Sequence, residues 1–467
     1  MPAAGIVALA ADKPALDTGH TAFMLVSAAL VMVMTPGLAF FYGGMVRVKS
    51  VLNMLMMSFI SLGVVTVVWT LFGFSLAFGT DHGGFIGGTD WLGLRHIGIT
   101  QLWPGFGIPV YVFAAFQMMF AVITPALISG ALADRVKFTA WTLFSTLWVI
   151  VVYLPVAHWV WGAGGWLAKL GVIDFAGGTA VHINAGAAAL GVILVTGRRI
   201  GFKKDPFRPH NLPLVMLGAG LLWFGWFGFN AGSWLGADGV AGAAFVNTQV
   251  ATAAAMLGWL GYERLRHGSF TTLGAASGAV AGLVAITPAC GSVSPLGAIA
   301  VGLIAGVLCS AAVGLKYKLG FDDSLDVVGV HMVGGIAGSL LVGLFATGGV
   351  GQSAKGLFYG GGFGQLGKQC VGVLCVLLYS LVVSAVLAKA IDRVMGFRVG
   401  ADEEVAGIDQ AEHAESGYDF AGVGSATRPV LAGLAQLTAR AEDRRTPGAP
   451  PGDPGPQAQA PQSKVDA

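Results

Sequence analysis

Two short segments of this 467-residue chain each place a histidine four residues before a glycine. The first reads TAVHINAG at 179–186 and the second reads VGVHMVGG at 328–335. A buried imidazole is desolvated, which favours its neutral form, and two neutral rings in contact can share one N–H. In such a pair, the remaining ring nitrogen of one histidine can donate a hydrogen bond and that of the other can accept one. His182 and His331 are therefore candidate pore residues, and the alternative is that both are satisfied core histidines.

Two further ionisable side chains, His158 and Asp174, also lie in or beside apolar segments. Ionisable groups in lipid are costly and usually functional. Asp174 precedes FAGGT, so its carboxylate either accepts backbone N–H groups at the start of a helix or contacts a permeating cation directly. A metal site is disfavoured because no third Cys, Glu or Asp ligand accompanies the histidines at helical spacing.

Aromatic residues could supply a second kind of site. Phe116 and Phe120 are four residues apart and therefore lie on one face of a helix. With nearby aromatic residues and one hydroxyl they could form a cage for a small cation, held by cation–π attraction and a hydroxyl acceptor. Core packing is the alternative. The candidates are Phe116, Phe120, Trp161, Trp226, Phe229 and Ser233.

The amino-acid composition indicates that these residues belong to a membrane protein. Hydrophobic residues make up 55% and charged residues 11% of the chain, whereas about 25% is charged in ordinary soluble domains. This excludes a soluble enzyme, and the motifs HExxH, GxSxG and GxxxxGK[ST] are also absent. The 72 glycines suit helices that approach closely in lipid. A net charge of +2 gives no reason to expect a nucleic-acid partner.

The stretches without charged residues predict an all-α polytopic membrane protein with eleven transmembrane helices. One stretch, 267–315, is too long for a single helix and is broken by Pro288 and Pro295, so it counts as two. The stretches are 18–46, 50–80, 96–133, 138–168, 175–197, 209–237, 239–262, 267–315, 327–354 and 369–388.

Basic residues predict the orientation of these helices. The loops after the odd-numbered helices hold most of the lysines and arginines, from Arg47 in the first to Lys318 in the last. The alternate loops hold only Arg95, Lys169, Lys355 and Lys368. Because basic loops stay in the cytoplasm, we expect the N-terminus outside and the C-terminus inside.

The two histidine segments also predict an internal repeat. They are five helices apart, so the second enters the membrane from the side opposite to the first. An aspartate precedes each, Asp174 and Asp326, at unequal distances. We expect a 5+5 inverted repeat plus a final helix, with the histidines meeting near the midplane only if their helices break or begin inside the membrane.

Four regions follow from these observations. Residues 1–19 are expected to form an extracellular segment and 20–392 the eleven-helix domain. Residues 393–420 are more polar and are expected to be a cytoplasmic C-terminal region. The last region, 421–467, becomes rich in Pro, Gly, Gln and Ala and is expected to be disordered.

Seven strings in the chain carry a family resemblance. They are MTPGLAFFYGG at 34–44, DFAGGTAVHINA at 174–185, PHNLP at 209–213, GWFGFNAGS at 225–233, AFVNT at 244–248, TPACG at 287–291 and DVVGVH at 326–331. From about residue 20 to 398 the chain resembles the ammonium transporter (Amt/Mep/Rh) family, of the bacterial Amt type.

The resemblance implies a homotrimer with a pore in each protomer and assigns a role to each candidate. The outer ammonium-recruitment site would consist of Phe116, Trp161 and Ser233, with Trp226 nearby and Asp174 behind it. Phe120 and Phe229 would be the stacked gate, and His182 and His331 the twin histidines of the pore. No cofactor and no metal is implied.

The function expected from the resemblance is selective ammonium transport at the plasma membrane by cation recruitment, deprotonation and conduction past the histidine pair. Ammonium or ammonia is the expected substrate, and methylammonium is a candidate analogue. Residues 408–418 resemble the family's C-terminal region, which implies docking of a PII-type signalling protein. The alternatives are a neutral channel for ammonia or CO2, and an ammonium sensor that signals through its tail.

Overall fold

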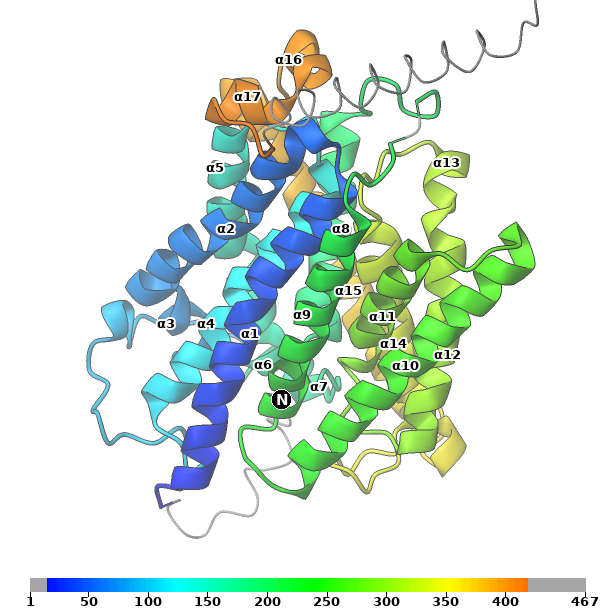
Figure 1. Cartoon of the computed structure of the whole chain (residues 1–467). Coiled ribbons are helices and arrows are strands. Elements are labelled where there is room, and N and C mark those ends of the chain that lie inside the picture. The colour runs from blue at the N-terminus through cyan, green and yellow to red at the C-terminus, as the bar shows by residue number, and fades with distance from the viewer. Residues whose placement is uncertain (1–14, 206, 419–467) are drawn as a thin grey trace, which may run out of the picture. The chain divides into compact units, whose positions relative to one another are not determined.

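The computed structural model describes residues 15–205 and 207–418, and these residues form a bundle of helices (Figure 1). Ten of the helices are long and apolar enough to cross a membrane. An eleventh, α11 (Thr272–Ile286), is apolar but has only 15 residues. The predicted all-α membrane fold is therefore confirmed, and the chain is a multi-pass membrane protein. The predicted disordered region, 421–467, lies outside the described residues.

Four of the ten long spans in the described residues are single α-helices, and the other six are assembled from consecutive helical pieces. The α-helices are α1 (Thr18–Met45), α2 (Val51–Val68), α3 (Phe74–Phe78), α4 (Val110–Ser129), α5 (Phe138–Trp148), α6 (Leu154–Trp161), α7 (Trp166–Leu170), α8 (Asn184–Thr196), α9 (Leu212–Gly232), α10 (Gly239–His267), α11, α12 (Pro295–Val313), α13 (Leu315–Leu319), α14 (Val333–Phe345), α15 (Gly364–Met395), α16 (Ala401–Ala406) and α17 (Ile408–His413).

Shorter helical segments and two strands make up the rest of the regular structure in the described residues. Four π-helical segments are η2 (Trp69–Gly73), η5 (Val149–Tyr153), η6 (Gly178–Ile183) and η7 (Val328–Met332). Four 3-10 segments are η1 (Val48–Ser50), η3 (Leu92–Leu94), η4 (Gly130–Leu132) and η8 (Leu357–Tyr359). Two antiparallel strands, β1 (Asp81–His82) and β2 (Ile86–Gly87), lie in the loop after α3.

Glycines bring neighbouring helices into backbone contact. Helices α1 and α9 lie side by side (Figure 1), and a Cβ atom added at Gly218 would lie 2.2 Å from the backbone nitrogen of Phe41. On α12, a Cβ atom at Gly302 would lie 2.2 Å from the carbonyl oxygen of Ala251. Larger side chains cannot be accommodated at these crossings. Close packing at such crossings is therefore one reason for the high glycine content.

The predicted spans differ from the helices at their ends. The charge-free stretch 96–133 begins fourteen residues before α4, and the stretch 327–354 continues past the end of α14. Both extra pieces are loops, because lack of charge does not distinguish a helix from a Gly- and Pro-rich loop. Conversely, α15 extends beyond 369–388 at both ends, and the charged residues Lys368 and Lys389 lie on it.

The last described helices pack on one end of the bundle, here called the tail end. Figure 1 shows α16 and α17 there. The side chain of Glu404 accepts a hydrogen bond from the backbone N–H of Ile200 at 2.6 Å. The carboxylate of Asp409 accepts from the backbone N–H groups of Leu52 at 3.0 Å and Asn53 at 2.8 Å. These bonds join the C-terminal region to the first turn of α2 and to the loop after α8.

A buried charge cluster ties the loops of the tail end together. Arg199 donates to Asp322 through Nε at 2.9 Å and through Nη2 at 2.9 Å. The fully buried Arg135 lies 3.5 Å from the Asp322 carboxylate and donates to its backbone carbonyl at 2.7 Å. Burial alone would raise the pKa of Asp322, but hydrogen bonds and the charges of the two arginines outweigh it, so that pKa is lowered.

We expect Asp322→Asn to destabilise the protein, because it leaves two buried guanidinium groups without their shared charge. The free energy of unfolding in detergent should fall by about 3 kcal/mol near neutral pH. Since the pKa of Asp322 is lowered in the folded state, its contribution is present above the unfolded-state pKa and is lost as the pH falls through the folded-state value.

The difference in unfolding temperature between variant and wild type should therefore be full at about pH 7 and shrink at about pH 3. Asp402→Asn is the matched control, because this carboxylate is exposed on α16. A difference that is absent at neutral pH, or equal at both pH values, contradicts the assignment.

Candidate functional site

A buried carboxylate starts the helix that carries the first histidine. Residues 174–177 are not helical, and η6 begins at Gly178. One oxygen of Asp174 accepts from the N–H groups of Gly177 at 2.9 Å and Gly178 at 2.5 Å. The other oxygen accepts from the N–H groups of Thr179 at 2.9 Å and Ala180 at 3.0 Å. A helix can thus begin inside the bundle with its first N–H groups satisfied, which supports the helix-start interpretation of Asp174.

A second buried carboxylate starts the helix that carries the second histidine. Asp323 accepts from the N–H groups of Val327 at 3.0 Å and Val328 at 2.7 Å, and η7 begins at Val328. Asp323 precedes His331 by the same eight residues that separate Asp174 from His182.

The sequence pattern pairs Asp174 with Asp326, and the structure corrects this pairing. Asp326 has a left-handed backbone conformation with φ of 64° and binds the amino group of Lys316 at 2.7 Å. Its side chain therefore forms an ion pair, whereas the carboxylate that matches Asp174 in spacing and in bonding is Asp323.

The two histidine helices run in opposite directions. Arg199, just after the end of α8, binds Asp322, just before the start of η7. The first helix therefore ends where the second begins. This arrangement agrees with the predicted inverted repeat.

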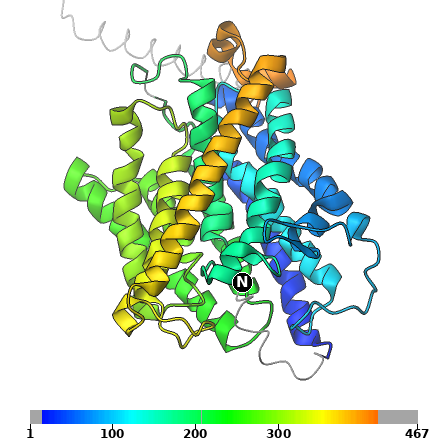
Figure 2. The same cartoon turned by 180° about the vertical axis from the view of Figure 1, so that it is seen from behind.

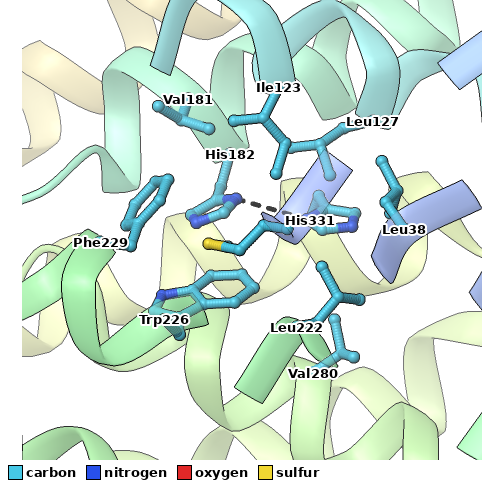
Figure 3. Close-up of a pocket in the computed structure, with 11 residues that line it drawn as sticks. Leu38, Ile123, Leu127, Val181, His182, Leu222, Trp226, Phe229, Val280 and His331 are labelled. Carbon is cyan, nitrogen blue, oxygen red and sulfur yellow. Dashed lines mark hydrogen bonds between the residues drawn. The ribbon is translucent and has the colours of Figure 1, made fainter. Parts of the chain in front are cut away.

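The two histidine side chains meet where these helices cross. The Nδ1 atoms of His182 and His331 are 3.3 Å apart (Figure 3). The side chains are buried, with 1% and 3% of the residue surface exposed. One neutral ring donates its Nδ1–H and the other accepts, so their Nε2 atoms supply one acceptor and one donor. Among the described residues, Nε2 of His182 has no hydrogen-bond partner.

The histidine pair forms part of the wall of a narrow apolar cavity (Figure 3). Its volume of about 10 Å³ is close to the space that one water molecule needs. Of the residues that the structure describes, no group of three His, Cys, Asp or Glu side chains could hold a metal ion. The cavity is lined by Met34, Leu38, Ile123, Leu127, Val181, His182, Leu222, Trp226, Phe229, Val280 and His331.

Two phenylalanine rings form a contact pair next to His182. The ring centroids of Phe120 on α4 and Phe229 on α9 are 4.2 Å apart with an interplanar angle of 31°. The Phe229 ring also lies 6.1 Å from the His182 ring. Both phenylalanines are 1% exposed. The two residues that the sequence grouped as a gate are therefore in contact with each other, and one of them, Phe229, lies directly beside His182.

Three other predicted residues gather around these phenylalanines. The Phe116 ring is 4.9 Å from the Phe120 ring, and the Trp161 ring is 5.9 Å from it at an interplanar angle of 88°. The Ser233 hydroxyl donates to the backbone carbonyl of Phe229 at 2.8 Å, which leaves its oxygen free to accept. We call Phe116, Trp161 and Ser233 the outer cage.

Trp226, which the sequence grouped with the outer cage, lies on the histidine side of the gate instead. Its ring stacks on His182 at 5.3 Å with an interplanar angle of 20°. Its indole N–H donates to the hydroxyl of Thr287 at 2.9 Å. Trp226 therefore lines the cavity and orients His182.

His158 does not join the other candidates. Its Nδ1 contacts the carbonyl oxygen of Ala77 at 2.8 Å and its Nε2 contacts the carboxylate of Asp81 at 3.0 Å. Lys169 lies 3.3 Å from the same carboxylate. The hydrogen bond to His158 is the main cause that lowers the pKa of Asp81. His158 thus links α6 to the loop after α3.

The sequence analysis did not identify two residues of this site, Asp323 and Thr287. Asp323 had a usable signal, because its spacing to His331 equals that of Asp174 to His182. Thr287 lies in the string TPACG, but its contact with Trp226 joins residues 61 positions apart in the chain and could not be inferred from that string.

Comparisons with known proteins place the chain among membrane transporters. The sequence model of the Ammonium Transporter Family matches residues 22–418. An ammonium transporter of Mycobacterium tuberculosis is 60% identical over 434 residues, covering 87% of this chain and 91% of the relative. An ammonium transporter of Bacillus subtilis is 47% identical and covers 86% of this chain and 99% of the relative.

Solved structures give the same result. A protein named Sensor Amt Protein superposes with a TM-score of 0.78 and 30% identity, over 85% of this chain and 98% of that chain. Saccharomyces cerevisiae Mep2 superposes with a TM-score of 0.77 and 35% identity, over 83% of this chain and 88% of that chain.

The crossing of the two histidine helices predicts the effect of one glycine substitution. A Cβ atom at Gly186 would lie 2.5 Å from the backbone nitrogen of Met332, so Gly186→Ala must push α8 and η7 apart. We expect the free energy of unfolding to fall by about 2 kcal/mol and the two histidine rings to separate in an experimental structure. Gly220→Ala on α9 is the control, because no atom lies within 4 Å of its added Cβ. Equal unfolding temperatures for the two variants would be inconsistent with the tight crossing.

Proposed function

This chain belongs to the ammonium transporter family, and on that premise we propose that it transports ammonium selectively across the plasma membrane through a pore in each protomer. The outer cage takes up the cation, the stacked phenylalanines exclude water, and the histidine pair receives the deprotonated substrate. The relatives are named as transporters, which supports transport rather than an enzymatic reaction.

The observation that carries this proposal is the unpartnered Nε2 of His182 beside a narrow apolar cavity. A buried polar nitrogen without a partner is costly, so a small polar guest that bonds to it is stabilised. The cavity volume of about 10 Å³ fits one water-sized molecule such as ammonia. A hydrated cation does not fit, and a bare cation in apolar surroundings is strongly disfavoured.

Deprotonation explains how selectivity arises. Ammonium is nearly the size of potassium, so the width of a pore does not separate them, but only ammonium can lose a proton and become neutral. At the outer cage, aromatic faces attract the cation and the Ser233 oxygen accepts one of its N–H groups. Ammonium then yields one ammonia and one proton, which pass separately along or beside the histidine pair.

The aspartate behind the cage supports this arrangement through the backbone. The carbonyl oxygen of Asp174 accepts the indole N–H of Trp161 at 3.0 Å, and its carboxylate holds the start of the His182 helix. Asp174 therefore joins the outer cage to the histidine pair, and we assign it this role in recruitment.

The assembly and the orientation are part of the same proposal. The bacterial Amt resemblance supports a homotrimer, and the distribution of basic residues supports an outer N-terminus and a cytoplasmic C-terminus. The tail end is then cytoplasmic and the outer cage faces outward. A PII-type signalling protein is the proposed partner at the cytoplasmic face, where α16 and α17 lie.

We expect the paired substitution of His182 and His331 by alanine to impair selective transport. Without titratable rings, the ammonium current of proteoliposomes on a solid-supported membrane, or its ratio to the potassium current, should fall by about tenfold or more, equivalent to about 1.4 kcal/mol. His267→Ala at the exposed end of α10 is the control. Unchanged selective current in the double variant refutes the role of the pair.

The same recordings separate the alternatives. Uptake without current identifies a neutral channel for ammonia or CO2. Ammonium binding without transport identifies a sensor, and one structural neighbour is itself named a sensor.

Two truncations test the PII-type partner. Chains that end after residue 399 lack α16 and α17, and they should lose binding of a purified trimeric PII-type protein in a pull-down. Chains that end after residue 418 keep both helices and should retain it. Binding that survives the first truncation contradicts the assignment.

A further inference from the structure

The side-chain amide of Gln369 on α15 binds the segment that precedes the His182 helix and the helix that continues from His331. We propose that Gln369 is a positioning residue for ammonium recruitment and selectivity. This inference rests on the proposed function, because it names the residue that fixes the geometry of the same pore. Helix α15 lies outside the repeat and crosses the bundle on the face seen in Figure 2.

The amide of Gln369 uses all of its hydrogen-bonding capacity. Its oxygen accepts from the N–H of Ile173 at 2.7 Å, and its nitrogen donates to the carbonyl of Ile173 at 2.7 Å. The nitrogen also donates to the carbonyl of Ser339 at 3.1 Å, and the oxygen also accepts from Gln365 at 3.0 Å. With two bonds given and two received, the side chain is locked. Gln369 is fully buried, with 0% of its surface exposed.

The partner segment needs this support because it is not helical. Residues 171–177 run through the bundle without regular structure between α7 and η6. Backbone polar groups within a membrane protein must be satisfied internally. Gln369 supplies both bonds to Ile173, and Gln365 donates to the carbonyl of Gly171 at 3.0 Å. The two glutamines, one helical turn apart, thus supply hydrogen bonds that a neighbouring backbone segment would otherwise provide.

The segment held by Gln369 controls the outer cage. Ile173 directly precedes Asp174, whose carbonyl oxygen receives the indole N–H of Trp161. The orientation of the Trp161 ring therefore depends on where residues 173 and 174 lie. A shift of this segment changes the cation–π geometry of the cage before it affects the rest of the bundle.

The same amide reaches both histidine helices. The carboxylate of Asp174 starts the helix of His182, and Ser339 lies on α14, eight residues after His331. Gln369 therefore joins the segment that precedes the His182 helix to α14, which continues the His331 helix. The carboxamide contributes acceptor and donor groups without adding a charge beside the site, so it leaves the cation-attracting field unchanged.

The test compares Gln369→Leu with Ser384→Ala in proteoliposomes on a solid-supported membrane. Both residues are buried on α15, but Ser384 accepts a hydrogen bond from Trp148 on α5 and does not contact residues 171–174. We expect Gln369→Leu to raise the half-saturating ammonium concentration by about fivefold, as loss of about one net hydrogen bond predicts, and to lower the ammonium-to-potassium current ratio. Ser384→Ala should change neither quantity.

A purely structural role gives a different result. Gln369→Leu would then lower the maximal current in proportion to the amount of folded protein and leave the half-saturating concentration and the current ratio as in wild type. That outcome overturns the proposal, as does a variant identical to wild type. If Gln369→Leu does not elute as folded protein in size-exclusion chromatography, Gln365→Leu is judged by the same criteria. Absence of selective current from the wild-type protein refutes the proposed function and not the placement of Gln369.

Discussion

The structure depends on starting two helices within a close-packed bundle, where the first backbone N–H groups need partners from the protein itself. Asp174 and Asp323 solve this problem with buried carboxylates that accept those N–H groups directly. Because each helix begins within the bundle, its histidine eight residues later lies deep enough to meet the other. The contact of 3.3 Å between the two rings follows from this paired geometry.

The cavity beside the histidine pair has walls of close-packed apolar side chains. Phe229 lies beside His182 and contacts Phe120 at a ring tilt of 31°, and Trp226 and aliphatic residues line the rest of the cavity. In such surroundings a cation is disfavoured, whereas a neutral molecule that hydrogen-bonds to an imidazole nitrogen is accepted. Under the proposed function, such walls disfavour potassium and require ammonium to lose its proton. The glycine at 186 lets the two helices approach closely at the histidine pair.

Periodic and local features of the sequence predicted most of the fold. Charge-free stretches identified the eleven helices, and the His–Gly spacing identified the two histidines that meet. Helix ends were less predictable, because loops such as 346–354 are as free of charge as the helix before them. The contacts of Trp226 with Thr287 and of Gln369 with Ile173 join residues far apart in the chain. No local pattern encodes such contacts, so the place of Trp226 and the role of Gln369 became visible only with the three-dimensional arrangement.

The central claim is that the pore selects ammonium by deprotonating it and moves both products. The most direct measurement records current and internal pH together from wild-type proteoliposomes after equal pulses of ammonium and of potassium. The account predicts a current for ammonium and none for potassium. Internal alkalinisation without any current, or equal currents for the two cations, would contradict it.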